Sequence, residues 1–215
     1  IAAAGSELSA SCVISNDETG VKSGFNSDLN RPLFAVCNPE LTFSVSKYQT
    51  GCGIVDIISH SFERFFSPSE HHELSDEFAL GAIRHVIEVG KTAIDNPRDY
   101  EARASLMLAS SFSHNGITGL GKKVSMPIHL IAHALSGYDP NIAHGAALSV
   151  MIPAWMAYVK DAELDKFAFF AREVFKIHFV NKEESANIGV RELRNFFKDI
   201  GMPVTLRELN IEKQD

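Results

Sequence analysis

The chain has 215 residues, of which 45% are hydrophobic and 22% are charged, and its formal net charge is -7. This composition is typical of a globular protein with one large domain or two small ones. An acidic chain without a basic run is a poor ligand for nucleic acid or for a membrane surface. No apolar stretch reaches the roughly 18 residues of a membrane-spanning helix. We therefore expect neither a nucleic-acid nor a membrane partner.

The three cysteines, Cys12, Cys37 and Cys52, are odd in number and form no CxxC pair. A disulfide framework normally needs an even set of cysteines in an oxidising compartment. We therefore expect free thiols and a cytoplasmic location.

Residues 1–45 differ in pattern from the rest of the chain. CVISN at 12–16 and LFAVC at 33–37 are predicted to be short strands, separated by a turn and a polar loop. After about residue 46 the spacing of apolar residues becomes helical. The chain begins at Ile1 and stops in polar residues, so we expect a fragment cut at both ends. The pattern predicts a mainly α fold preceded by a short segment that contains strands.

Helix start and stop signals divide the second part of the chain. Proline is tolerated in a first helical turn, and glycine is a common residue just after a last one. Helices are expected over 53–66, from Ser75 or Asp76 to the break at 95–97, from Asp99 toward Asn115, from Pro127 to a C-cap at Gly137, over 144–159 with an interruption near Pro153, over 161–178 and over 189–200.

Asp56 and His60 are four residues apart on a predicted helix, so their side chains leave the same face. Their neighbours Ile57 and Ile58 are apolar, which places the pair close to a core. Burying an unpaired carboxylate is costly, and a metal ion or a hydrogen-bonded partner removes that cost. The pair is therefore either half of a metal site or an Asp–His hydrogen bond without metal.

A second group of histidines comprises His129, His133 and His144. Three histidines within 16 residues favour chemistry over a structural role, although spacing alone does not identify which of them bind metal. Carboxylate and imidazole ligands suit Zn(II), Fe(II), Co(II) or Ni(II). The other histidines are expected to be structural or on the surface, with His114 able to line a cleft: His71, His72, His85, His114 and His178.

Several segments, in the same order along the chain, resemble the iron-containing (group III) alcohol dehydrogenases. The resemblance is strongest to their butanol-dehydrogenase-like and NADPH-dependent aldehyde reductase branch. The matching segments are AAAGSE (2–7), VISNDETGVK (13–22), NPELTFSVSKYQTGCGIVDIISHSFE (38–63), NPRDYEARASLM (96–107), NGITGLG (115–121) and IHLIAHALSGYDPNIAHG (128–145).

This resemblance implies a dehydroquinate-synthase-like architecture, in which an α/β dinucleotide-binding domain precedes a helical metal-binding domain. Residues 1–45 would be the C-terminal remnant of the first domain, and residues 46–215 the second domain, truncated at its C-terminus. The implied activity is NAD(P)-linked interconversion of a small primary alcohol and an aldehyde, in a protein that is a homodimer at full length.

The resemblance also implies roles for particular residues. The metal, Fe(II) or else Zn(II), would be held by Asp56, His60, His129 and His144. His133 would lie beside the nicotinamide and act in proton relay or contact the cofactor. NAD or NADP would contact Gly5, Ser6 and Lys22.

Three departures from the family pattern are evident. The glycine-rich phosphate loop is absent, Ala4 replaces a frequent threonine, and the segment between His133 and His144 is one residue longer. Without phosphate-binding backbone, we expect these 215 residues to bind metal but to oxidise no alcohol by themselves. Two alternatives are a polyol or polyol-phosphate dehydrogenase of the same fold, and a metal-binding helical module without enzymatic activity.

Overall fold

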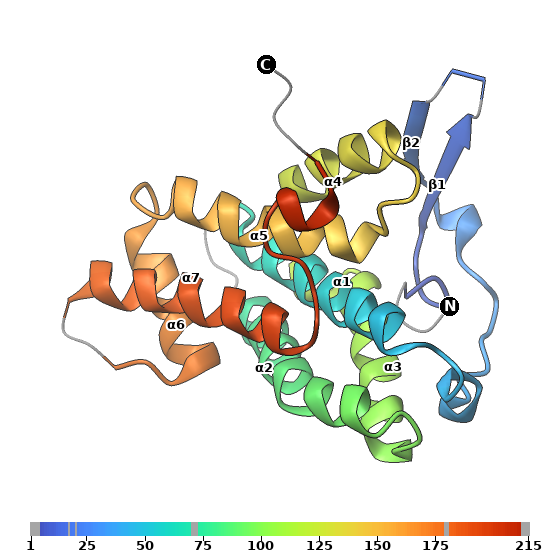
Figure 1. The fold of residues 1–215 in the computed structure, drawn as a ribbon, viewed down its shortest axis with the longest axis horizontal. Coiled ribbons are helices and arrows are strands. Elements are labelled where there is room, and N and C mark those ends of the chain that lie inside the picture. Colours follow the sequence, from blue (N-terminus) through green and yellow to red (C-terminus); the bar gives the residue numbers. More distant parts are fainter. Residues whose placement is uncertain (1–4, 17, 20, 70–72, 179–180, 212–215) are drawn as a thin grey trace.

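The computed structural model describes residues 5–16, 18–19, 21–69, 73–178 and 181–211 (Figure 1). A two-stranded antiparallel sheet, β1 (Ser11–Asn16) and β2 (Val21–Asn26), precedes a set of packed helices. The helices are α1 (Lys47–Phe66), α2 (Glu73–Asp95), α3 (Tyr100–His114), α4 (Pro127–Tyr138), α5 (His144–Val159), α6 (Leu164–Phe175) and α7 (Lys182–Asp199). The mainly helical fold predicted from the sequence is confirmed.

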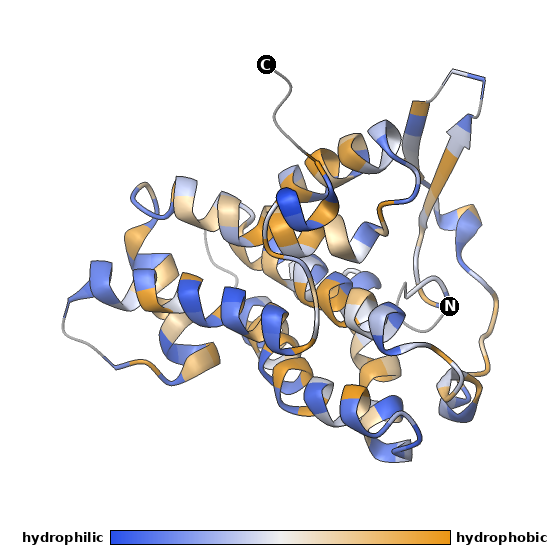
Figure 2. Cartoon of the chain, viewed as in Figure 1, coloured by the Kyte–Doolittle hydropathy of each residue, from blue (hydrophilic) through white to orange (hydrophobic). Residues whose placement is uncertain are grey.

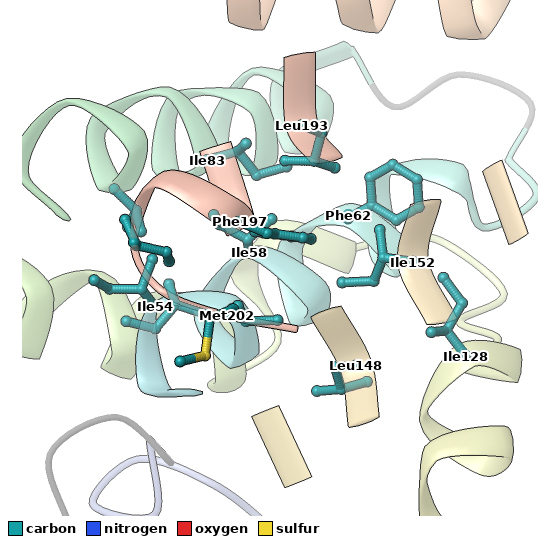
Figure 3. Close-up of a cluster of buried hydrophobic side chains, with 14 of the residues drawn as sticks. Ile54, Ile58, Phe62, Ile83, Ile128, Leu148, Ile152, Leu193, Phe197 and Met202 are labelled. Atoms are coloured by element: carbon teal, nitrogen blue, oxygen red, sulfur yellow. The ribbon is translucent and has the colours of Figure 1, made fainter. Parts of the chain in front are cut away.

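Helix α1 runs through the centre of the molecule, between α2, α3 and α5 (Figure 1). Its residues Ile54, Ile58 and Phe62 follow one another at four-residue intervals, so they form a single apolar stripe. All three are essentially inaccessible to solvent. Figure 3 shows this stripe meeting side chains of α2, α4, α5 and α7, namely Ile83, Ile128, Leu148, Ile152, Leu193 and Phe197.

Helices α4 and α5 carry the most apolar sequences, whereas α7 shows polar residues on its outer side (Figure 2). Full burial of a large apolar side chain contributes about 1.5–3 kcal/mol. The burial of α1 by its neighbours therefore provides the rigid frame on which polar side chains of α1 are held.

The strand predicted at 33–37 is wrong, because β2 forms instead at 21–26, inside the segment predicted as a loop. Pairing in the hairpin runs from Ser11 opposite Asn26 to Asn16 opposite Val21. In contrast, Leu33, Phe34 and Val36 are exposed and have no strand assignment. Apolar character alone predicted a strand, but a strand also needs a partner for its backbone groups.

Several helix boundaries differ from the prediction for local reasons. Helix α1 begins at Lys47 because the Ser46 hydroxyl accepts a hydrogen bond from the Gln49 amide, and Asn181 caps α7 in the same way. Gly137 lies within α4, whose C-cap is Asp139. Helix α5 continues through Pro153 without interruption.

None of the helices in the described part of the chain is long and apolar enough to cross a membrane.

The contact between α5 and α1 depends on Gly145. A Cβ atom at this position would lie 2.5 Å from Cys52 Cα, closer than real atoms approach. We predict that Gly145→Ala lowers the free energy of unfolding by about 1–3 kcal/mol or more, because the backbones must separate. Urea denaturation followed by circular dichroism measures this change.

Gly81→Ala is the matched control, since its added methyl group meets only the flexible end of Arg84 at 3.9 Å. Replacing a helical glycine by alanine there should stabilise the protein by up to about 1 kcal/mol. Equal stability of the two variants would contradict the close contact between α1 and α5.

Candidate metal centre

Asp56 and His60 lie on one face of α1, with His60 Nδ1 3.7 Å from Asp56 Oδ2. Both side chains are largely buried, and the Asp56 side chain is 13% exposed. Residues four apart on a helix lie on the same face, and the other faces of α1 pack against the core. The side chains of Asp56 and His60 therefore point to the same side of α1. This part of the predicted site is therefore assembled by α1 alone.

Helices α4 and α5 bring two further imidazoles to the same carboxylate. His129 Nε2 lies 3.7 Å from Asp56 Oδ1, and His144 Nε2 lies 3.5 Å from that oxygen. His144 is the first residue of α5, directly before the close contact of Gly145 with α1. Donor atoms of Asp56, His60 and His129 all lie within 4.8 Å of one another.

These distances fit the donor set of a divalent ion. They are longer than hydrogen bonds, but they match the edge of about 3.4 Å expected for a tetrahedral site with metal–ligand bonds of about 2.1 Å. Asp56 Oδ1 and His129 Nε2 are also buried without a hydrogen-bond partner in the described part of the chain. An ion between them would satisfy both atoms at once.

The charges in the cluster are strongly coupled. Burial raises the pKa of Asp56, but the surrounding imidazoles of His60, His144 and His129 outweigh burial and lower this pKa below its ordinary value. Burial lowers the pKa of His60, and it lowers the pKa of His144 to about 4. Both imidazoles are therefore neutral at pH 7, the form that binds a metal ion.

His129 behaves differently from its neighbours. Burial lowers its pKa, but the carboxylates of Asp56 and Glu63 outweigh this effect and raise the pKa to about 9. In the absence of an ion, the imidazole of His129 is therefore doubly protonated and positively charged at pH 7. A metal ion must displace the proton on Nε2 to bind there.

Glu63 was not singled out by the sequence analysis. It lies on α1, is 2% exposed, and its Oε2 is hydrogen-bonded to His129 Nδ1. Its position in the sequence could have indicated a role at the site, because residues 56, 60 and 63 share one helix face.

His133 and Lys22 lie together beside His144. The ring of His133 is 5.1 Å from that of His144, measured between centroids. Burial lowers the pKa of His133, and the positive charge of Lys22 lowers it further. The contact between β2 and α4 thus places the residue predicted to bind cofactor next to the residue predicted to relay protons.

Gly5 and Ser6 are positioned by α3. Gly5 has φ of +58°, and a Cβ there would lie 2.6 Å from His114 Cβ. The segment remains in contact with α3 at Glu7, which accepts a hydrogen bond from Ser111 Oγ. Ser6 is exposed.

His114 is closer to the site than its sequence context suggested. Its ring lies 4.0 Å from that of His60, and burial lowers its pKa to about 4. His85 and His178 are exposed, as expected of surface residues. Ala4, His71 and His72 lie outside the described residues.

A cavity of about 370 Å³ adjoins Asp56 and His144. Its other walls are mainly apolar and include Cys52, Ile57 and Leu106. A pocket of this size and character accommodates a small organic molecule. The cluster of donor atoms thus has space beside it for a ligand.

Comparison with known proteins identifies relatives over the whole chain. The model of the C-terminal part of the Fe-containing alcohol dehydrogenase family matches residues 50–215. NADH-dependent butanol dehydrogenase A of Clostridium acetobutylicum is 41% identical over 216 residues, which cover 99% of this chain and 55% of that protein. The NADPH-dependent aldehyde reductase YqhD of Escherichia coli is 30% identical over 98% of this chain and 54% of its own length.

The fold agrees with these sequence relatives. The crystal structure of NADH-dependent butanol dehydrogenase A from Thermotoga maritima superposes with a TM-score of 0.94 at 36% identity, over 99% of this chain and 53% of that one. The chain therefore spans about half the length of the curated relatives that it matches.

The geometry of the cluster predicts stabilisation by a divalent ion. Zn(II) at about 100 times its dissociation constant should raise the free energy of unfolding by about 2.7 kcal/mol, because the ion binds only the folded chain. Asp56→Asn should abolish most of this gain, whereas His85→Ala, at an exposed position, should keep it. Urea denaturation with and without Zn(II) measures the effect, and no gain for the unsubstituted chain would contradict the site.

Proposed function

Because the chain belongs to the iron-containing alcohol dehydrogenase family, in the branch of butanol dehydrogenases and aldehyde reductases, we propose that it forms the metal-binding part of a metal-dependent, NAD(P)-linked oxidoreductase. The reaction interconverts a small primary alcohol and the corresponding aldehyde. The observation that carries this proposal is the convergence of His60, His129 and His144 on the single carboxylate of Asp56.

Asp56, His60, His129 and His144 are the proposed ligands of a divalent ion, Fe(II) or else Zn(II). When bound, the ion would act as a Lewis acid on the substrate oxygen, and NAD(P) would exchange the hydride. His60 and His144 are neutral at pH 7, and His129 would become neutral on giving up its Nε2 proton. Asp56 would therefore be the one charged ligand, and a divalent ion there would keep a net positive charge. The adjoining cavity orients the carbon chain of the substrate and keeps water away from it.

His133 is proposed to carry the proton that enters or leaves the substrate oxygen. It lies one helical turn after His129 and is half-buried, so it has access both to the site and to solvent. Histidine is the side chain best suited to this transfer near neutral pH.

Lys22, Gly5 and Ser6 are the proposed contacts of NAD or NADP, and residues 1–45 the part of the chain on the nucleotide side of the site. Lys22 supports this assignment by its position next to His133, where a cation would meet a phosphate or a ribose. A homodimer, a cytoplasmic location and the absence of nucleic-acid and membrane partners complete the proposal.

The first experiment removes one ligand from the enzyme that contains this chain. In anaerobically prepared protein loaded with Fe(II), His129→Ala should lower kcat/KM for butanal reduction by at least about a hundredfold, since Lewis-acid stabilisation is worth several kcal/mol. Elemental analysis of the same samples should show loss of the metal. His85→Ala serves as the control, and unchanged turnover in His129→Ala would refute the proposed mechanism.

The second experiment separates proton transfer from metal binding. His133→Ala should lower kcat by about 10²-fold, the contribution of a positioned acid or base. Its metal content should equal that of the unsubstituted enzyme, because His133 is not a proposed ligand. Loss of metal together with activity would instead make His133 a ligand.

A further inference from the structure

Glu63 is a buried carboxylate of α1 that is neither a proposed metal ligand nor a proposed cofactor contact. Its carboxylate belongs to α1 but makes most of its hydrogen bonds with the start of α4, more than 60 residues later in the chain. Burial of a carboxylate costs free energy unless both oxygens accept hydrogen bonds, so the hydrogen-bond partners of Glu63 explain why it can be buried.

One oxygen of Glu63 caps α4. Oε1 accepts hydrogen bonds from the backbone amides of Ile128 at 2.7 Å and His129 at 3.4 Å. These amides lie in the first turn of α4, where backbone amides have no acceptor within their own helix. Met126, the residue before α4, provides no side-chain cap. A negative charge at this end also interacts favourably with the helix dipole.

The other oxygen of Glu63 contacts the imidazole of His129. Oε2 is hydrogen-bonded to Nδ1 and also accepts from Ser59 Oγ at 3.4 Å. A neutral imidazole carries one proton, and a carboxylate only accepts hydrogen bonds. When a metal ion displaces the proton from Nε2, the one proton that remains therefore resides on Nδ1, held by Glu63, and Nε2 offers its lone pair on the side that faces Asp56.

We propose that Glu63 is a positioning residue, which selects the metal-binding tautomer of His129 and fixes the ring by the same carboxylate that caps α4. The inference rests on the proposed function, because it takes from it the ion that His129 faces. A carboxylate on the far nitrogen of a histidine ligand typically contributes 10- to 100-fold in metal affinity. Glu63 thereby links the docking of α4 on α1 to metal binding.

Glu63→Gln tests this role with almost no change in shape. The amide oxygen of glutamine can still accept from the Ile128 amide, so the cap remains. Its NH₂ group, however, faces Nδ1 and requires an acceptor there. The proton then moves to Nε2, where it blocks the metal, as in other sites where an amide replaces a carboxylate beside histidine.

The measurement is a titration with Co(II), whose visible spectrum reports the ligands. We expect Glu63→Gln to bind Co(II) about 10- to 100-fold more weakly and to give the spectrum of His129→Ala rather than that of the unsubstituted protein. The metal-free variant should remain folded but unfold at a lower temperature, because the charge that pairs with protonated His129 and with the helix dipole is lost. Glu88→Gln, an exposed change on α2, is the matched control and should not differ from the unsubstituted protein in either measurement.

The outcomes separate the two proposals. If the unsubstituted protein binds Co(II) and Glu63→Gln binds it equally well with the same spectrum, the role of Glu63 is refuted and the proposed function stands. If the unsubstituted protein binds no divalent ion, both are refuted. If Glu63→Gln unfolds, Ser59→Ala removes the lesser hydrogen bond to Oε2, and its Co(II) affinity should then fall by a smaller factor; an unchanged affinity refutes the inference.

Discussion

The structure depends on how the charge of one buried carboxylate is compensated. Asp56 sits on a helix that is covered by other helices on most of its surface, where an isolated negative charge is costly. Three imidazoles from three helices surround it, and in the proposed function a divalent ion held by these groups would compensate the charge. The packing of α4 and α5 on α1 therefore serves to place nitrogen atoms as much as to bury apolar surface.

Helix α1 combines two functions by dividing its surface. Ile54, Ile58 and Phe62 form the stripe that joins the core, and Asp56 and His60 occupy a different face. Because both sets repeat at about one turn, any rotation of α1 that moved the donors would also expose the stripe. The apolar core thus fixes the direction of the polar side chains, which is the arrangement that a preorganised site requires.

Much of the helical fold could be predicted from the sequence, because it depends on local spacing. Spacing also placed Asp56 and His60 on one helix face, whereas the choice among the remaining histidines came from the resemblance to a family. Asp99 caps α3 and Pro127 opens α4, as local signals indicate. The hairpin strand β2 could not be predicted, since its stability comes from pairing with β1 rather than from its own apolar pattern. Glu63 was missed for a related reason: an acidic residue on a helix is normally a solvated charge, and its partners lie in a helix distant in sequence.

The position of Lys22 depends on a hairpin that has little stability of its own. Two-stranded hairpins are only marginally stable alone, so β1 and β2 owe their place to neighbouring parts of the protein. Lys22 pairs with Ser15, and neighbouring residues of a strand point to opposite faces. A slip of the strands by a single residue would turn the ammonium group away from α4. With Lys22 as the proposed nucleotide contact, a change in the register of β1 and β2 would therefore alter nucleotide binding without replacing any of the four proposed metal ligands.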